Sequence, residues 1–90
     1  MIIKICGIKS LDTLYCCEKN NVHFFGMIFY KKSPRNITIG KAKELQTASK
    51  KLEIEGVGVF VNFDFNNLER YINELGLKVG AETIETMSPL

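Results

Sequence analysis

The chain alternates short apolar runs with longer stretches in which apolar residues recur at helical spacing. Residues 2–6 are rich in β-branched side chains, residues 22–29 form an almost unbroken apolar run, and residues 56–62 repeat that pattern. Continuous apolar runs bounded by glycine or polar residues are typical of strands covered on both faces. The pattern therefore predicts three short buried strands.

The stretches between these runs predict amphipathic helices. Ser10, Thr38 and either Asn62 or Asp64 are suited to N-cap the three helices, and Gly76 has the position of a C-cap glycine after the third. Each helix has an apolar stripe at i, i+3 and i+4 spacing. The stripes are Leu11, Leu14 and Tyr15; Ile39, Ala42, Leu45, Ala48 and Leu52; and Phe65, Leu68, Tyr71, Ile72 and Leu75.

Three strand–helix units in succession predict an α/β fold with parallel strands, because such units are joined by right-handed crossovers. Residues 77–79 resemble the start of a fourth strand, after which residues 79–90 lose the pattern. We expect a single domain over residues 1–90, with no linker.

The composition of the chain reduces the number of function classes to consider. A balance of 12 basic and 10 acidic residues is too even to favour nucleic acid or a membrane surface as the main partner. There is no apolar run of transmembrane length and no signal-peptide pattern, so we expect a cytoplasmic protein. The three cysteines are then expected to be reduced thiols rather than disulfides.

Parallel βα folds bind ligands at the C-terminal ends of their strands. Cys6 ends the first predicted strand, Arg35 lies in the loop after the second, and Asn62 ends the third, so the three are expected to converge on one face. On the residues alone, a buried core thiol is the commoner role for Cys6, and the cluster of Lys31, Lys32 and Arg35 is more often a solvated loop than an anion site.

Cys16, Cys17 and His23 lie elsewhere: the two cysteines on the first helix, and His23 at the opposite rim. Adjacent cysteines lack the spacing of C-x2-C ligand pairs, so we expect no metal site. Neither a G-x-G-x-x-G fingerprint nor a phosphate-loop motif is present, and we expect no cofactor.

Three motifs carry a resemblance to a known family. KICGI at residues 4–8, GMIFYKKSPRNI at residues 26–37 and VGVFVN at residues 57–62 resemble the opening of phosphoribosylanthranilate isomerases of tryptophan biosynthesis, in the same order and spacing. The resemblance covers about residues 1–78. It implies the N-terminal part of a TIM (β/α)8 barrel, about three and a half of its eight units, since a full barrel has roughly 250 residues.

The resemblance also implies a reaction and roles. The family converts N-(5-phosphoribosyl)anthranilate into 1-(2-carboxyphenylamino)-1-deoxyribulose 5-phosphate by an Amadori rearrangement. Cys6 matches the general base that removes the C2′ proton. Arg35 matches the arginine that holds the anthranilate carboxylate, a role that suits the planar guanidinium fork. Asn36 stands where the family often has an aromatic residue, so the loop is expected to pack differently.

The family's general acid and its phosphate-binding loops belong to later strands and have no counterpart in the 90 residues. We therefore expect a truncated isomerase that is inactive alone and whose partners are a phosphorylated small molecule and a complementary barrel fragment. The alternative is a non-catalytic partial-barrel interaction module that self-associates or pairs with such a fragment, because unpaired sheet edges invite pairing.

Overall fold

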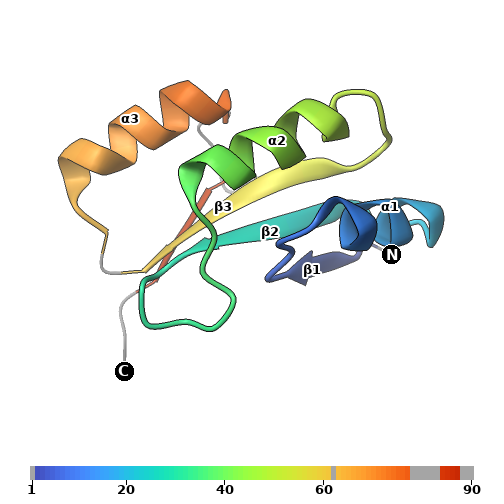
Figure 1. Cartoon of the computed structure of the whole chain (residues 1–90), viewed down its shortest axis with the longest axis horizontal. Helices are drawn as coiled ribbons and strands as arrows, with labels where there is room; N and C mark the ends of the chain where they lie inside the picture. Colours follow the sequence, from blue (N-terminus) through green and yellow to red (C-terminus); the bar gives the residue numbers. More distant parts are fainter. Residues whose placement is uncertain (1, 62, 78–83, 88–90) are drawn as a thin grey trace.

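The computed structural model describes residues 2–61, 63–77 and 84–87. In this part of the chain three helices alternate with four strands (Figure 1). The strands are β1 (Lys4–Cys6), β2 (Phe24–Phe29), β3 (Glu55–Val61) and β4 (Ile84–Met87), and the helices are α1 (Leu11–Lys19), α2 (Ile39–Ser49) and α3 (Phe65–Leu75).

The four strands form one parallel sheet in the order β1-β2-β3-β4. This is the arrangement expected of consecutive βα units, and it confirms the predicted α/β class. None of the helices described is long and apolar enough to cross a membrane.

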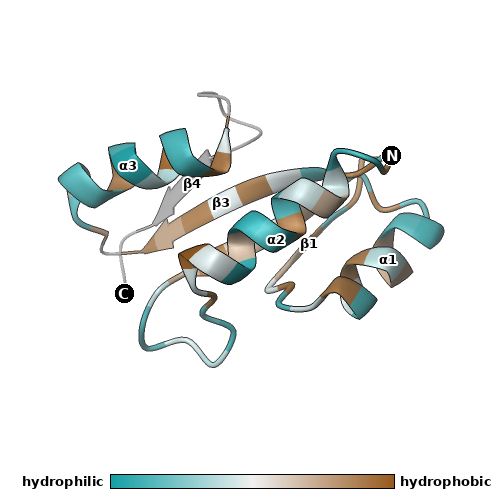
Figure 2. Ribbon diagram, turned by 45° about the horizontal axis from the view of Figure 1, so that its top comes forward, coloured by the Kyte–Doolittle hydropathy of each residue, from teal (hydrophilic) through white to brown (hydrophobic). Residues whose placement is uncertain are grey.

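One side of the sheet is covered by helices. Figures 1 and 2 show α2 and α3 lying over the same face of the sheet. Ala42 and Leu45 of α2 and Leu75 of α3 belong to the buried core, and α1 packs beside α2. Phe25 and Met27 of β2, Phe60 of β3, Leu14 of α1 and Leu45 of α2 are at most 1% exposed in this core.

The strand register assigns the remaining side chains to the other face, because side chains alternate along a strand and residues paired in a parallel ladder point the same way. Cys6 pairs with Gly26, which pairs with Val57. Val57 and Val59 are buried but lie outside the helix-side cluster. Cys6 therefore lies on the face opposite the helices.

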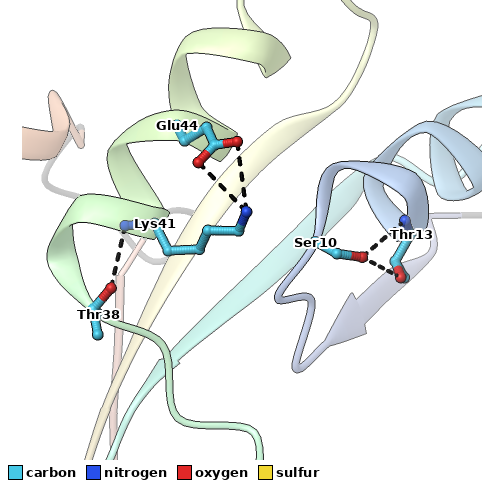
Figure 3. A network of polar contacts seen from close by, with 5 residues as sticks. All are labelled: Ser10, Thr13, Thr38, Lys41 and Glu44. Carbon is cyan, nitrogen blue, oxygen red and sulfur yellow. Dashed lines mark hydrogen bonds and ion pairs between the residues drawn. The ribbon is translucent and has the colours of Figure 1, made fainter.

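Two of the predicted N-caps have the expected hydrogen bonds. The backbone N–H of Thr13 donates to Ser10 Oγ at 3.2 Å, and that of Lys41 donates to Thr38 Oγ1 at 3.3 Å (Figure 3). Asp64 is the N-cap residue of α3 by position, but its side chain makes no capping bond. These bonds satisfy N–H groups that a helix start leaves without partners.

A fourth strand follows α3, and of its predicted start at residues 77–79 the structure describes only Leu77. Leu77 lies in no strand, residues 78–79 lie outside those described, and β4 runs over Ile84–Met87, where no pattern was recognised. Gly76 ends α3 in the left-handed conformation with a φ of 66°, as predicted, and the N–H of Leu77 then donates to Ile72 O at 3.0 Å. Leu77 thus closes the C-terminus of α3 and is buried in the core, as in a Schellman-type cap.

Candidate active site

Cys6 is the last residue of β1, and its thiol lies across the backbone of the neighbouring strand. A Cβ atom built on Gly26 would be 2.7 Å from Cys6 Sγ and 3.0 Å from Cys6 Cα. Real Cβ atoms essentially never approach this closely, so the thiol occupies space that only a glycine leaves free. Cys6 is partly exposed and is a free thiol.

The chain turns sharply after Cys6. The N–H groups of Gly7 and Ile8 both donate to Gly26 O, at 2.9 and 3.1 Å, and Gly7 has a φ of 87°. This conformation is accessible to glycine and strained for residues with a side chain. The turn leads into α1 and leaves Cys6 at the C-terminal end of β1, where parallel βα folds place their ligands.

Arg35 lies directly over this turn. A Cβ atom on Gly7 would be 3.1 Å from Arg35 Nε and 3.2 Å from Nη1, and closer still to Cδ. The arginine comes from the loop between β2 and α2, yet its side chain packs on the residue that follows Cys6. The structure therefore places the Arg35 side chain, the predicted ligand of the carboxylate, on the residue next to Cys6, the predicted base. Asn62, the third residue expected at this face, lies outside the described residues.

Hydrogen bonds within the β2–α2 loop hold Arg35 in place. The N–H of Tyr30 donates to Asn36 Oδ1 at 2.8 Å, and the N–H of Ile37 donates to Ile28 O at 2.9 Å. The N–H of Arg35 donates to Ser33 Oγ at 3.1 Å. Asn36 was noted only as a departure from an aromatic position, and its role in closing the loop was missed. The tendency of asparagine to bond nearby backbone was the available signal.

A second anchor comes from the other loop at this end of the sheet. Lys9, two residues after Gly7, donates from Nζ to Pro34 O at 3.2 Å. The segment after β1 and the segment after β2 are therefore tied together next to Cys6 and Arg35.

A separate cavity of about 550 Å³ opens between the β2–α2 loop and the start of α3. Its lining includes Phe29, Lys31, Asn36, Phe63 and Tyr71. The ring of Phe63, which lies between β3 and α3, packs edge-on against Tyr71 with the centroids 4.9 Å apart. Neither Cys6 nor Arg35 lines this cavity.

The other two cysteines and the histidine lie away from this corner. Cys17 is buried on α1, and burial, with a smaller contribution from Cys16, raises the pKa of its thiol above the ordinary value. Cys16 is exposed. His23 lies at the start of β2, where its Nδ1 accepts the N–H of Ile3 at 3.0 Å. In the part of the chain that the structure describes, no group of three or more potential metal ligands occurs.

Comparison with known proteins decides the family. The model of the N-(5'phosphoribosyl)anthranilate (PRA) isomerase family matches residues 3–80. The chain belongs to the PRA isomerase family. It is 36% identical over 85 residues to the PRA isomerase of Paracoccus denitrificans, covering 90% of this chain and 39% of that protein. It is 33% identical over 72 residues to the enzyme of Aquifex aeolicus, covering 80% and 35% of the two.

Solved PRA isomerase structures share the fold. The phosphoribosylanthranilate isomerase of Thermotoga maritima superposes on the whole chain with a TM-score of 0.82 at 26% identity, and the chain covers 44% of it. The enzyme of Pyrococcus furiosus gives a TM-score of 0.76 at 31% identity, over 98% of this chain and 40% of that one. The chain thus spans less than half the length of these PRA isomerases. Three βα units and a fourth strand correspond to the N-terminal part of their barrel, as predicted.

Proposed function

We propose that this chain supplies the general base and the carboxylate-binding arginine of a phosphoribosylanthranilate isomerase. The observation that carries the proposal is the contact of the Arg35 side chain with Gly7, next to the thiol-bearing Cys6. Cys6 and Arg35 lie 29 positions apart and match the family's motifs, and Arg35 packs on the residue after Cys6, at the strand end where such folds bind ligands. Family membership supports the reaction class.

Each side chain has a defined task in this reaction. The guanidinium of Arg35 donates two parallel N–H bonds to the carboxylate of the anthranilate group and fixes the substrate's orientation. The Cys6 thiolate then removes the C2′ proton of the ring-opened iminium, and the electron pair of the broken C–H bond forms the enamine. Arg35 acts in binding, and Cys6 in the chemical step.

These 90 residues do not supply the whole site. The opening of the ribose ring needs a general acid, and the phosphate group needs its own binding loops; the family places both on later strands. We propose that the 90 residues form one partial barrel domain that is inactive alone and gains activity when the later strands are provided. Removal of one member of a cooperating catalytic set is severely costly.

Complementation of a tryptophan auxotroph that lacks the isomerase tests this proposal. The 90-residue chain is expressed alone and with the remaining C-terminal portion of the Paracoccus denitrificans enzyme, which is a relative at 36% identity. We expect growth only with both parts, and loss of growth with Cys6→Ser. Growth from the chain alone, abolished by Cys6→Ser, would contradict the proposed inactivity. Undiminished growth of the Cys6→Ser pair would contradict the base assignment.

Steady-state kinetics of the assembled pair tests Arg35. Arg35→Lys keeps the charge but loses the fork, so we expect KM to rise about 10- to 100-fold with a smaller change in kcat. Lys32→Ala is the matched control, since Lys32 is an exposed cation of the same loop. Equal KM values for the two variants would remove Arg35 from the binding site.

A second candidate function rests on the exposed apolar residues near the N-terminus. Ile2, Ile3 and Ile5 are 74%, 39% and 42% exposed, and in the described sheet β1 has a neighbour on one side only. The alternative proposal is a non-catalytic module whose β1 edge pairs with a complementary barrel fragment. Light scattering of a mixture of the chain and the fragment should detect a complex, and Ile5→Lys should abolish it. A complex that Ile5→Lys leaves unaffected would contradict this alternative, as would self-association of the chain in place of pairing.

A further inference from the structure

Gly26 contacts both Cys6 and the turn that follows it. Its Cα faces the thiol, and its carbonyl oxygen accepts the N–H groups of Gly7 and Ile8. We propose that Gly26 is a positioning residue for the Cys6 thiol: the absence of a side chain on β2 sets where the sulfur atom sits at the end of β1. The link to catalysis rests on the proposed function, whereas the positioning of the sulfur does not.

Rotation of the Cys6 side chain relieves only part of the contact. A Cβ atom at position 26 would be 2.7 Å from Sγ, but also 3.0 Å from Cys6 Cα and 3.1 Å from its Cβ. The last two atoms move only with the backbone. An alanine at position 26 must therefore turn the thiol away from β2 and also shift the end of β1 by a few tenths of an ångström.

Other glycines of the chain provide controls. Gly58 lies on the helix-covered face of β3, where a Cβ atom would be 2.7 Å from Phe60 Cε2 and 2.9 Å from Leu77 Cδ1. Alanine there crowds the core without contacting Cys6. Gly40, in the first turn of α2, has nothing within 4 Å of the added Cβ. Gly58→Ala therefore matches the crowding of Gly26→Ala, and Gly40→Ala matches the chemical change alone.

Alkylation of Cys6 measures the position of the sulfur without any requirement for activity. Trypsin cleaves after Lys4, Lys9 and Lys19, so Cys6 is quantified on the peptide of residues 5–9. The peptide of residues 10–19 contains both Cys16 and Cys17, and fragment ions distinguish the exposed Cys16, which is the internal reference. With the full 90-residue chain and iodoacetamide, we expect Gly26→Ala to raise the Cys6 rate about threefold or more relative to Cys16, because the thiol leaves its contact with β2.

The controls decide the cause of such a change. Gly58→Ala and Gly40→Ala should leave the Cys6-to-Cys16 ratio within about twofold of the parent, because neither added methyl group reaches the thiol. A ratio in Gly26→Ala that is unchanged or lowered overturns the proposal, and so does an equal rise in Gly58→Ala. Should Gly26→Ala fail to fold, Cys6→Gly is combined with it, because this change removes both the Sγ and the Cβ atom that the added methyl group would meet. Recovery of folding supports the contact, and continued failure overturns it.

The assembled pair of the proposed function gives a second measurement. Displacement of the base by a fraction of an ångström to 1 Å is expected to lower kcat up to about 100-fold, with KM within about threefold, because Arg35 rests on Gly7 rather than on Gly26. A rise in KM without a loss of kcat in Gly26→Ala contradicts a positioning role. Absence of activity in the parent pair contradicts the proposed function alone, since the alkylation result stands apart from it.

Discussion

The middle of the sheet and its β1 edge differ in how well they are covered. Phe25, Met27 and Phe60, on β2 and β3 beneath the helices, are at most 1% exposed. Ile3 and Ile5, at the β1 edge, are 39% and 42% exposed although Ile5 pairs in register with the fully buried Phe25. The burial of apolar side chains therefore falls sharply from β2 to its neighbour β1.

This difference separates the residues that stabilise the fold from those of the proposed site. The best-packed side chains lie on β2 and β3, whereas Cys6 belongs to a three-residue strand that the described sheet supports on one side only. Substitutions in the middle should therefore change the free energy of unfolding. Substitutions around Cys6, Gly7 and Gly26 should change the geometry of the site more than they change the fold.

The largest effect is expected from truncating a central aromatic side chain. Phe60 stacks on Phe29 with ring centroids 4.9 Å apart and is 1% exposed. Phe60→Ala should lower the free energy of unfolding by about 3–5 kcal/mol, through lost burial and the cavity left behind. Ile5→Ala, the edge counterpart, should cost about 1 kcal/mol or less. Urea unfolding followed by circular dichroism measures both.

Comparable losses in these two variants would contradict the contrast between middle and edge. The denaturant dependence must also stay the same in the two variants, because a changed slope would indicate an altered denatured state instead of lost packing.

A smaller effect is expected at the helix starts. Ser10 caps α1, which follows β1, and Thr38 caps α2 over the middle of the sheet. Ser10→Ala and Thr38→Ala should each lower the free energy of unfolding by about 1 kcal/mol, because each removes the acceptor of one N–H group at a helix start. Urea unfolding is again the measurement, with each variant compared to the parent chain.

Asp64 provides the control for this pair. It occupies the N-cap position of α3 without a capping bond, so Asp64→Ala should cost about 0.5 kcal/mol or less. A loss at Asp64 as large as at Ser10 would show that the capping hydrogen bonds are not what stabilises these helix starts.

The sequence predicted those parts of the fold that depend on local signals. Helix ends are indicated by residues within one turn of them, here Ser10, Thr38 and Gly76. The apolar runs are long enough to indicate strands without knowledge of the strands that they pair with. β4 was missed because Leu77 looks like a strand residue but closes the C-terminus of α3, and the four residues of β4 carry too short a pattern. Element ends depend on tertiary contacts that a local pattern does not contain.

The proposed site was inferred only through the family motifs. The direction of the strands places Cys6 and Arg35 at the same end of the sheet. It does not predict that Arg35 packs on Gly7. Gly26 was read as part of an apolar run, because nothing local indicates that its Cα faces a thiol 20 residues away in sequence. The register between β1 and β2 creates that contact, and register is a property of the folded sheet.

The smallest effect concerns ionisation, and it also reports the difference in burial. Burial, and to a lesser extent Cys16, raises the pKa of the Cys17 thiol in the folded chain. The unfolded chain therefore loses this proton first as pH rises past an ordinary thiol pKa of about 8.5. The stability associated with the neutral thiol is complete below that pH and declines above it, until the folded-state pKa is passed.

The free energy of unfolding, measured at pH 7.5 and pH 10, tests this linkage. The decline between the two values should be smaller in Cys17→Ala than in the parent, because the Cys17 thiol is the ionisable group by which the two chains differ. Cys16→Ala should keep most of the decline, since Cys16 is exposed and the burial of Cys17 is left in place. An identical decline in the parent and in Cys17→Ala would mean that the core around α1 admits water. The boundary between well-buried and poorly buried side chains would then lie between α1 and α2, and not between β1 and β2.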